Sequence, residues 1–103
     1  TVHAKDCEIV KHNLARGGLN MYMQDGWGRL DRSFRFRIPG WGDVDWKRLI
    51  SELFLTGYNG VFNYEHEDVI MSRADGVKKT IDFLRPLMID APYEGRNDKL
   101  FTK

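Results

Sequence analysis

The sequence predicts an α/β fold made of two strand–helix units whose strands run parallel. Two short stretches, residues 2–6 and 61–68, alternate in the way a strand does, and an amphipathic helical pattern follows at some point after each. A strand, a helical crossover and a second strand of the same sheet pack as a right-handed parallel unit. Two parallel strands are too few for a stable sheet, so we expect further strands from more polypeptide or from other copies of the chain.

Composition excludes several kinds of partner. The chain has 103 residues with 42% hydrophobic and 13% aromatic side chains, which fits one small ordered domain. Sixteen basic and 15 acidic residues give a net charge of +1, so neither nucleic acid nor a membrane surface is expected as a partner. Cys7 is the single cysteine, and no signal peptide is recognisable. We expect a cytoplasmic protein, and the start at Thr1 suggests a piece of a longer polypeptide.

The first predicted strand covers residues 2–6 and places two polar side chains, His3 and Lys5, on the same face. The second predicted strand covers residues 61–68 and places Glu65 and Glu67 on one face. Phe62 and Tyr64 point to its other face, together with His66, which we interpret as a packing residue. Two carboxylates about 7 Å apart along a strand do not pair with each other. Their burial would require a cation nearby, either a metal ion or a basic side chain.

Residues 7–39 show no sustained periodicity and contain several glycines, so we predict a long loop that closes over a site. Within it, residues 33–38 alternate and place Arg35 and Arg37 on one edge. These arginines are either the solvated face of an edge strand or a bidentate clamp for phosphate or carboxylate.

Two helices follow from spacing and capping signals. Apolar residues recur at helical spacing from Trp46, with Asp43 or Asp45 as the cap and Gly57 as the stop. A second helix is predicted after Ser72, and Pro86 should weaken its last turn. Its predicted buried face consists of Val77, Ile81, Leu84 and Met88.

Four stretches match a known family in order and spacing. They are His3-Ala4-Lys5-Asp6, Arg35-Phe36-Arg37-Ile38-Pro39-Gly40-Trp41-Gly42-Asp43-Val44-Asp45-Trp46, Gly57-Tyr58-Asn59-Gly60 and Tyr64-Glu65-His66-Glu67-Asp68. With them the chain resembles the C-terminal part of the sugar phosphate isomerase/epimerase family of xylose isomerase-like (β/α)8 TIM barrels. The resemblance implies that residues 1–88 form strand–helix units seven and eight, an incomplete barrel on their own. Residues 89–103 are mostly polar, with Pro92 and Gly95, and are predicted to form a tail.

The resemblance also implies a divalent metal ion, Mn, Co, Mg or Zn, held by a Glu, an Asp, a His and a second Glu. His3 falls at the histidine ligand and Glu65 at the second glutamate, whereas the other two ligands belong to strands outside this sequence. The implied reaction isomerises or epimerises a sugar or sugar phosphate by removing a proton beside a carbonyl, through an enediolate that the metal stabilises. We expect the chain alone to bind metal weakly or not at all and to be inactive.

The same resemblance suggests roles for further residues. Glu65 would also be the acid/base glutamate, and Glu67 would contact the substrate or support the ligands. Lys5 would either pair with a carboxylate or contact a substrate phosphate. Arg35, Arg37 and Trp41 are substrate-binding candidates, although Trp41 and Trp27 are as often packing anchors in glycine-rich loops.

Two other functions are considered. The chain could be a non-catalytic piece, either a truncated fragment or a module that binds without turnover. A DNA-repair endonuclease of the same barrel superfamily would need clustered zinc ligands and a basic groove. With three histidines and a net charge of +1, the sequence gives that function little support.

Overall fold

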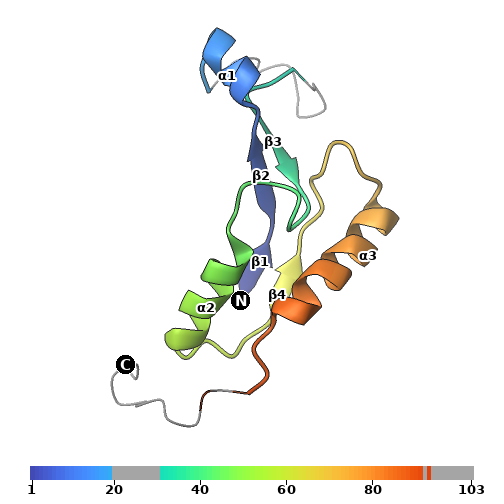
Figure 1. Cartoon of the computed structure of the whole chain (residues 1–103). Helices are drawn as coiled ribbons and strands as arrows, with labels where there is room; N and C mark the ends of the chain where they lie inside the picture. Colours follow the sequence, from blue (N-terminus) through green and yellow to red (C-terminus); the bar gives the residue numbers. More distant parts are fainter. Residues whose placement is uncertain (20–30, 92, 94–103) are drawn as a thin grey trace.

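A computed structural model describes residues 1–19, 31–91 and 93, and it forms a mixed α/β arrangement (Figure 1). The elements in chain order are β1 (Val2–Ala4), β2 (Asp6–Ile9), α1 (Lys11–Gly17), β3 (Phe34–Arg37), α2 (Trp46–Leu55), β4 (Phe62–Tyr64), α3 (Arg73–Leu84) and a 3-10 turn η2 (Arg85–Leu87).

Two small sheets meet at Lys5. β1 pairs with β4 in parallel, with His3 opposite Asn63, which confirms the parallel pairing of the two predicted strands. β2 pairs with β3 in antiparallel orientation, with Asp6 opposite Arg37. Since β1 ends one residue before Lys5 and β2 begins one residue after it, the chain passes from one sheet to the other at this lysine. Both parallel strands are shorter than predicted, because regular pairing covers three residues of each.

The core lies between the parallel strands and the helices that flank them. α2 and α3 lie on either side of the β1–β4 pair, while the β2–β3 sheet extends away from it (Figure 1). The opposite strand positions His3 and Asn63 are exposed. The buried residues of the core are Ala4, Trp46, Ile50 and Leu84, with Leu49, Phe62, Phe83, Leu87 and Met88 packed against them.

Local signals determine where the two longer helices begin. The Asp45 side chain accepts a hydrogen bond from the Arg48 backbone N–H at 3.2 Å, which makes Asp45 the cap of α2. The Ser72 hydroxyl oxygen accepts from the Asp75 N–H at 3.2 Å and caps α3. Pro86 lies in the 3-10 turn η2, directly after the α-helical part ends. These predicted boundaries are confirmed.

The predicted buried face of α3 is wrong in part. Leu84 is buried and Met88 packs against the core as predicted, but Val77 and Ile81 are 39% and 43% exposed, and Gly76 and Thr80 are buried in their place. Gly76 allows this face to be buried because it carries no side chain where α3 approaches the rings of Tyr64 and His66. The spacing of apolar residues alone does not predict this, because the buried face of α3 also includes Gly76 and Thr80, which are not apolar side chains.

The prediction of a loop through residues 7–39 is also wrong for much of the described chain. The segment contains most of β2, the short helix α1 and the whole of β3. β2 is stabilised by pairing with β3, from which it is separated by residues 10–33 of the sequence. A strand of only four residues is too short to show a clear periodic pattern. Trp27 lies outside the described residues, as do residues 92 and 94–103 of the predicted tail.

None of the described helices combines the length and the apolar character needed to cross a membrane.

Candidate functional site

The ends of the two parallel strands bring His3 and Glu65 together. Nδ1 of His3 lies 3.5 Å from Oε2 of Glu65, and their side chains are 68% and 44% exposed. The register of β1 and β4 explains this contact, because Glu65 follows β4 on the same face as Asn63, the residue opposite His3. The two predicted metal ligands are therefore adjacent and accessible on the open face of the sheet.

A second pair lies two residues further along each of the two segments, between Lys5 and Glu67. Nζ of Lys5 lies 2.7 Å from Oε1 of Glu67, so a basic neighbour of the kind expected for these carboxylates is present. The ammonium group also lies 4.3 Å from the centroid of the Phe36 ring on β3. The hydrogen bond from Lys5 lowers the pKa of Glu67 below its ordinary value.

Asp6 is 1% exposed and accepts hydrogen bonds from the turn after β3. Its carboxylate receives the indole N–H of Trp46 at 2.8 Å and the backbone N–H of Cys7 at 2.8 Å. Three more backbone N–H groups, from Gly40, Gly42 and Val44, donate at 3.0, 3.2 and 3.1 Å. Such a set of donors replaces the water that burial removes from an ionised carboxylate.

Gly42 is required for this close approach. A Cβ atom at this position would lie 2.6 Å from the backbone oxygen of Cys7 and even closer to the Asp6 carboxylate. The turn can therefore reach Asp6 only with glycine here.

Asp68 is the corresponding buried carboxylate after β4. It accepts from Nε of Arg37 at 2.9 Å and from the backbone N–H groups of Ile38, Ile70 and Met71 at 2.9, 2.8 and 2.8 Å. Burial alone would raise the pKa of Asp68, but these hydrogen bonds, that from Arg37 first, lower it below its ordinary value. The pair joins β3 to the segment after β4.

Glu8 connects the two arginines of β3. Its Oε1 lies 2.7 Å from Nε of Arg35 and 3.1 Å from Nη1 of Arg37. Burial opposes ionisation of Glu8, but the hydrogen bonds from both arginines lower its pKa. The guanidinium of Arg37 also lies 5.6 Å from the ring centroid of Trp41, which is 47% exposed.

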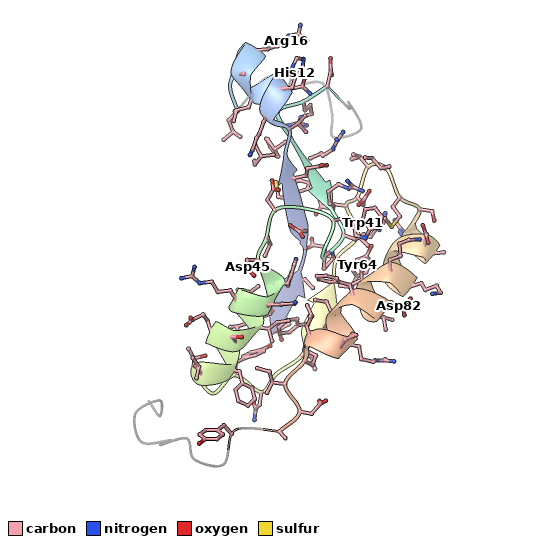
Figure 2. The ribbon with its side chains drawn as sticks, viewed as in Figure 1. His12, Arg16, Trp41, Asp45, Tyr64 and Asp82 are labelled. Atoms are coloured by element: carbon pink, nitrogen blue, oxygen red, sulfur yellow. The ribbon has the colours of Figure 1, made fainter. Side chains whose placement is uncertain are left out.

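The structure thus groups the predicted residues in two sets. The metal-ligand candidates His3 and Glu65 and the pair Lys5 and Glu67 lie together at the strand ends. Arg35 and Arg37 contact Glu8 and Asp68 instead, and Trp41 lies on the turn between β3 and α2, as Figure 2 shows. The substrate-binding roles of Arg35, Arg37 and Trp41 stay predictions.

Sequence reasoning missed Asp6, Asp68 and Glu8. A signal for the two aspartates was present, since each strand end reads as a site residue, a spacer, a second site residue and then Asp: His3-Ala4-Lys5-Asp6 and Glu65-His66-Glu67-Asp68. The shared pattern becomes meaningful only once the two strands are known to lie side by side.

Within the part of the chain that the structure describes, no three His, Cys, Asp or Glu side chains are grouped as a metal ion would require. The described residues therefore offer one nitrogen and one carboxylate at the strand ends, and a complete ligand set would need groups from elsewhere.

No protein-family model matches this sequence, and no curated protein matches it either.

Proposed function

We propose that this chain forms the last two strand–helix units of a (β/α)8 barrel and contributes two metal ligands to a sugar or sugar phosphate isomerase or epimerase of the cytoplasm. The observation that carries the proposal is the contact between His3 and Glu65, 3.5 Å apart at the ends of adjacent parallel strands. Active sites of α/β barrels are built at this edge of the sheet.

The donor set of the two residues fits a divalent metal ion. Imidazole nitrogen and carboxylate oxygen together suit Mn, Co, Zn or Mg. Two ligands bonded to one ion at about 2.1 Å lie about 3.0–3.4 Å apart at tetrahedral or octahedral angles, close to the separation of His3 and Glu65. The exposure of both side chains leaves room for further ligands from the rest of a barrel. When bound, the metal ion would polarise a substrate carbonyl.

The other residues of the site suit the handling of a proton beside that carbonyl. A carboxylate can accept a carbon-bound proton only when ionised, and we assign this task to Glu65. Glu67 is oriented by its hydrogen bond from Lys5, and we assign to it a contact with a substrate hydroxyl. Lys5 holds Glu67 in position from a fixed place above Phe36.

A second candidate is a module that binds without turnover. The observation in its favour is that basic side chains suited to an anionic substrate are engaged by carboxylates, Lys5 by Glu67 and Arg37 by Glu8 and Asp68. A substrate phosphate would have to displace these partners or be bound elsewhere.

The experiment is an exchange assay in D2O with a panel of ketoses and their phosphates, each with Mn²⁺, Co²⁺, Mg²⁺ or Zn²⁺. It is run on this chain and on a longer polypeptide that contains it. We expect metal-dependent proton exchange in the longer polypeptide and its loss, by at least about 100-fold, in His3→Ala and Glu65→Gln. Asn63→Ala changes the same exposed face without removing a ligand and should keep activity.

Full activity in either ligand variant would contradict the assignment of that residue. Metal binding by calorimetry with no exchange for any sugar would favour the binding module instead. The folded state of each variant is checked by circular dichroism.

A further inference from the structure

We propose that Asp6 and Asp68 are positioning residues of this site: both anchor the segment 37–46 by its backbone, and so fix Lys5 and Glu67 against each other. The proposal rests on the proposed function, because it concerns the same strand ends. It adds two residues that touch neither a ligand nor a substrate and act through their neighbours.

The first argument is that both carboxylates bind the same segment. Asp6 accepts from the backbone N–H groups of Gly40, Gly42 and Val44, and Asp68 accepts from that of Ile38. Asp6 lies two residues after the end of β1, and Asp68 lies four residues after the end of β4. The segment is therefore attached to the chain beyond the carboxyl ends of both parallel strands.

The second argument concerns direction. In extended backbone, successive side chains point to opposite sides, so an Asp held in the interior directs the residue before it toward the open face. The burial agrees with this, because Asp6 and Asp68 are 1% and 8% exposed while the side chains of Lys5 and Glu67, the residues before them, are 28% and 37% exposed. The 2.7 Å contact between Lys5 and Glu67 is the result that these two anchors produce.

The third argument is that stability alone does not call for charged groups here. An ionised carboxylate is costly to bury, and apolar residues of similar size commonly serve as well or better in a core. A carboxylate with several fixed donors instead defines one backbone geometry, which is what a site built on rigid elements needs. The segment held by the two aspartates carries Trp41. It begins directly after Phe36 of β3, whose ring contacts the ammonium group of Lys5.

Asp6→Asn tests the proposal, since it keeps the size of the side chain and removes its charge. We expect the amide exchange of Gly40, Gly42 and Val44 to accelerate by about tenfold or more relative to Glu65, whose N–H bonds to the Ala4 carbonyl in the parallel pair. The indole N–H resonance of Trp46 should shift, because it loses a charged acceptor. In the longer polypeptide, kcat should fall by about tenfold or more while the affinity for Mn²⁺ alone changes little.

Asp43→Asn is the matched control. Asp43 belongs to the same turn and accepts from the Ile9 N–H at 2.7 Å, but it links the turn to β2 only. This variant removes the same charge and should leave kcat and the exchange of Gly40 unchanged. If Asp6→Asn does not fold, Trp46→Phe removes the indole donor and keeps an aromatic ring in the core, and it should give a smaller acceleration of exchange at Gly40, Gly42 and Val44 relative to Glu65.

Unchanged exchange at Gly40, Gly42 and Val44 in the folded variant would overturn the proposal. Equal acceleration at Glu65 would overturn it as well, because that result describes a loss of global stability rather than of position. Should the wild-type protein show no turnover, the proposed function fails, while the exchange measurements still decide whether Asp6 positions the segment.

Discussion

Nζ of Lys5 lies 2.7 Å from Oε1 of Glu67, which joins the residue directly after β1 to the segment after β4. The lysine and glutamate side chains are 28% and 37% exposed, so solvent weakens their attraction. A pair of this kind contributes little to stability, and its interest lies in the orientation that it gives Glu67.

Glu67→Gln is expected to reduce the proposed turnover by about 100-fold while lowering the free energy of unfolding by less than about 1 kcal/mol. The amide keeps the shape of the side chain but cannot carry the negative charge that Lys5 stabilises. Proton-exchange kinetics and thermal unfolding measure the two effects. Asp82→Asn, which removes the same charge from an exposed helical pair with Lys78, should change neither quantity appreciably. A large loss of stability in Glu67→Gln would assign the pair a structural role instead.

Arg37→Met is expected to lower the free energy of unfolding by about 3–5 kcal/mol, because it leaves the fully buried Asp68 carboxylate without its cationic partner. Urea unfolding followed by circular dichroism measures the loss. Arg35→Met is the matched control on the same strand, where the partner Glu8 is 30% exposed and the expected cost is about 1 kcal/mol or less. Equal losses in the two variants would contradict the importance assigned to burial.

The sequence predicts those parts of the fold that depend on neighbours in the chain. Asp45 and Ser72 cap helices through residues three positions away, and such signals are visible in a short window. The β2–β3 sheet depends instead on contacts such as Glu8 with Arg35, which lie far apart in the chain. Most of β2 therefore appeared as part of a loop, whereas the alternation of residues 33–38 agrees with β3.

The candidate site divides in the same way. His3 and Glu65 are metal-ligand candidates because of a family resemblance, and that role stays a prediction, whereas their proximity follows from parallel pairing of β1 and β4. Asp6 shares only the strand-end pattern with Asp68, and its role was missed because its donors are mostly backbone N–H groups whose positions depend on the folded turn. A backbone donor set has no sequence signature other than glycine where the approach is close, as at Gly42.

Asp68 should make the protein sensitive to acid. Its pKa is lowered in the folded state, so between the folded and unfolded pKa values the unfolded chain binds more protons and stability rises with pH. The stabilisation is complete above the unfolded value of about 3.9 and is lost as pH falls through the lower folded value. Unfolding free energies measured from pH 7 down to about 2 test this.

Asp68→Asn provides the comparison, because an amide does not titrate in this range. Its stability should be lower than that of the wild type at pH 7 and should fall less steeply below about pH 4. Parallel curves for the two proteins would show that other carboxylates cause the acid sensitivity.

Gly76→Ala is expected to destabilise the protein by about 1–3 kcal/mol, although the same change in a solvent-exposed helix interior stabilises by about 1 kcal/mol. Gly76 is buried on α3, and an added Cβ would lie 2.6 Å from the Tyr64 hydroxyl and 2.9 Å from Nδ1 of His66. The double variant with Tyr64→Phe removes the nearest of these atoms. Urea unfolding of both single variants and the double variant should therefore show a positive coupling, with part of the loss recovered. Simple addition of the two single effects would mean that the helix accommodates the methyl group by moving away from β4.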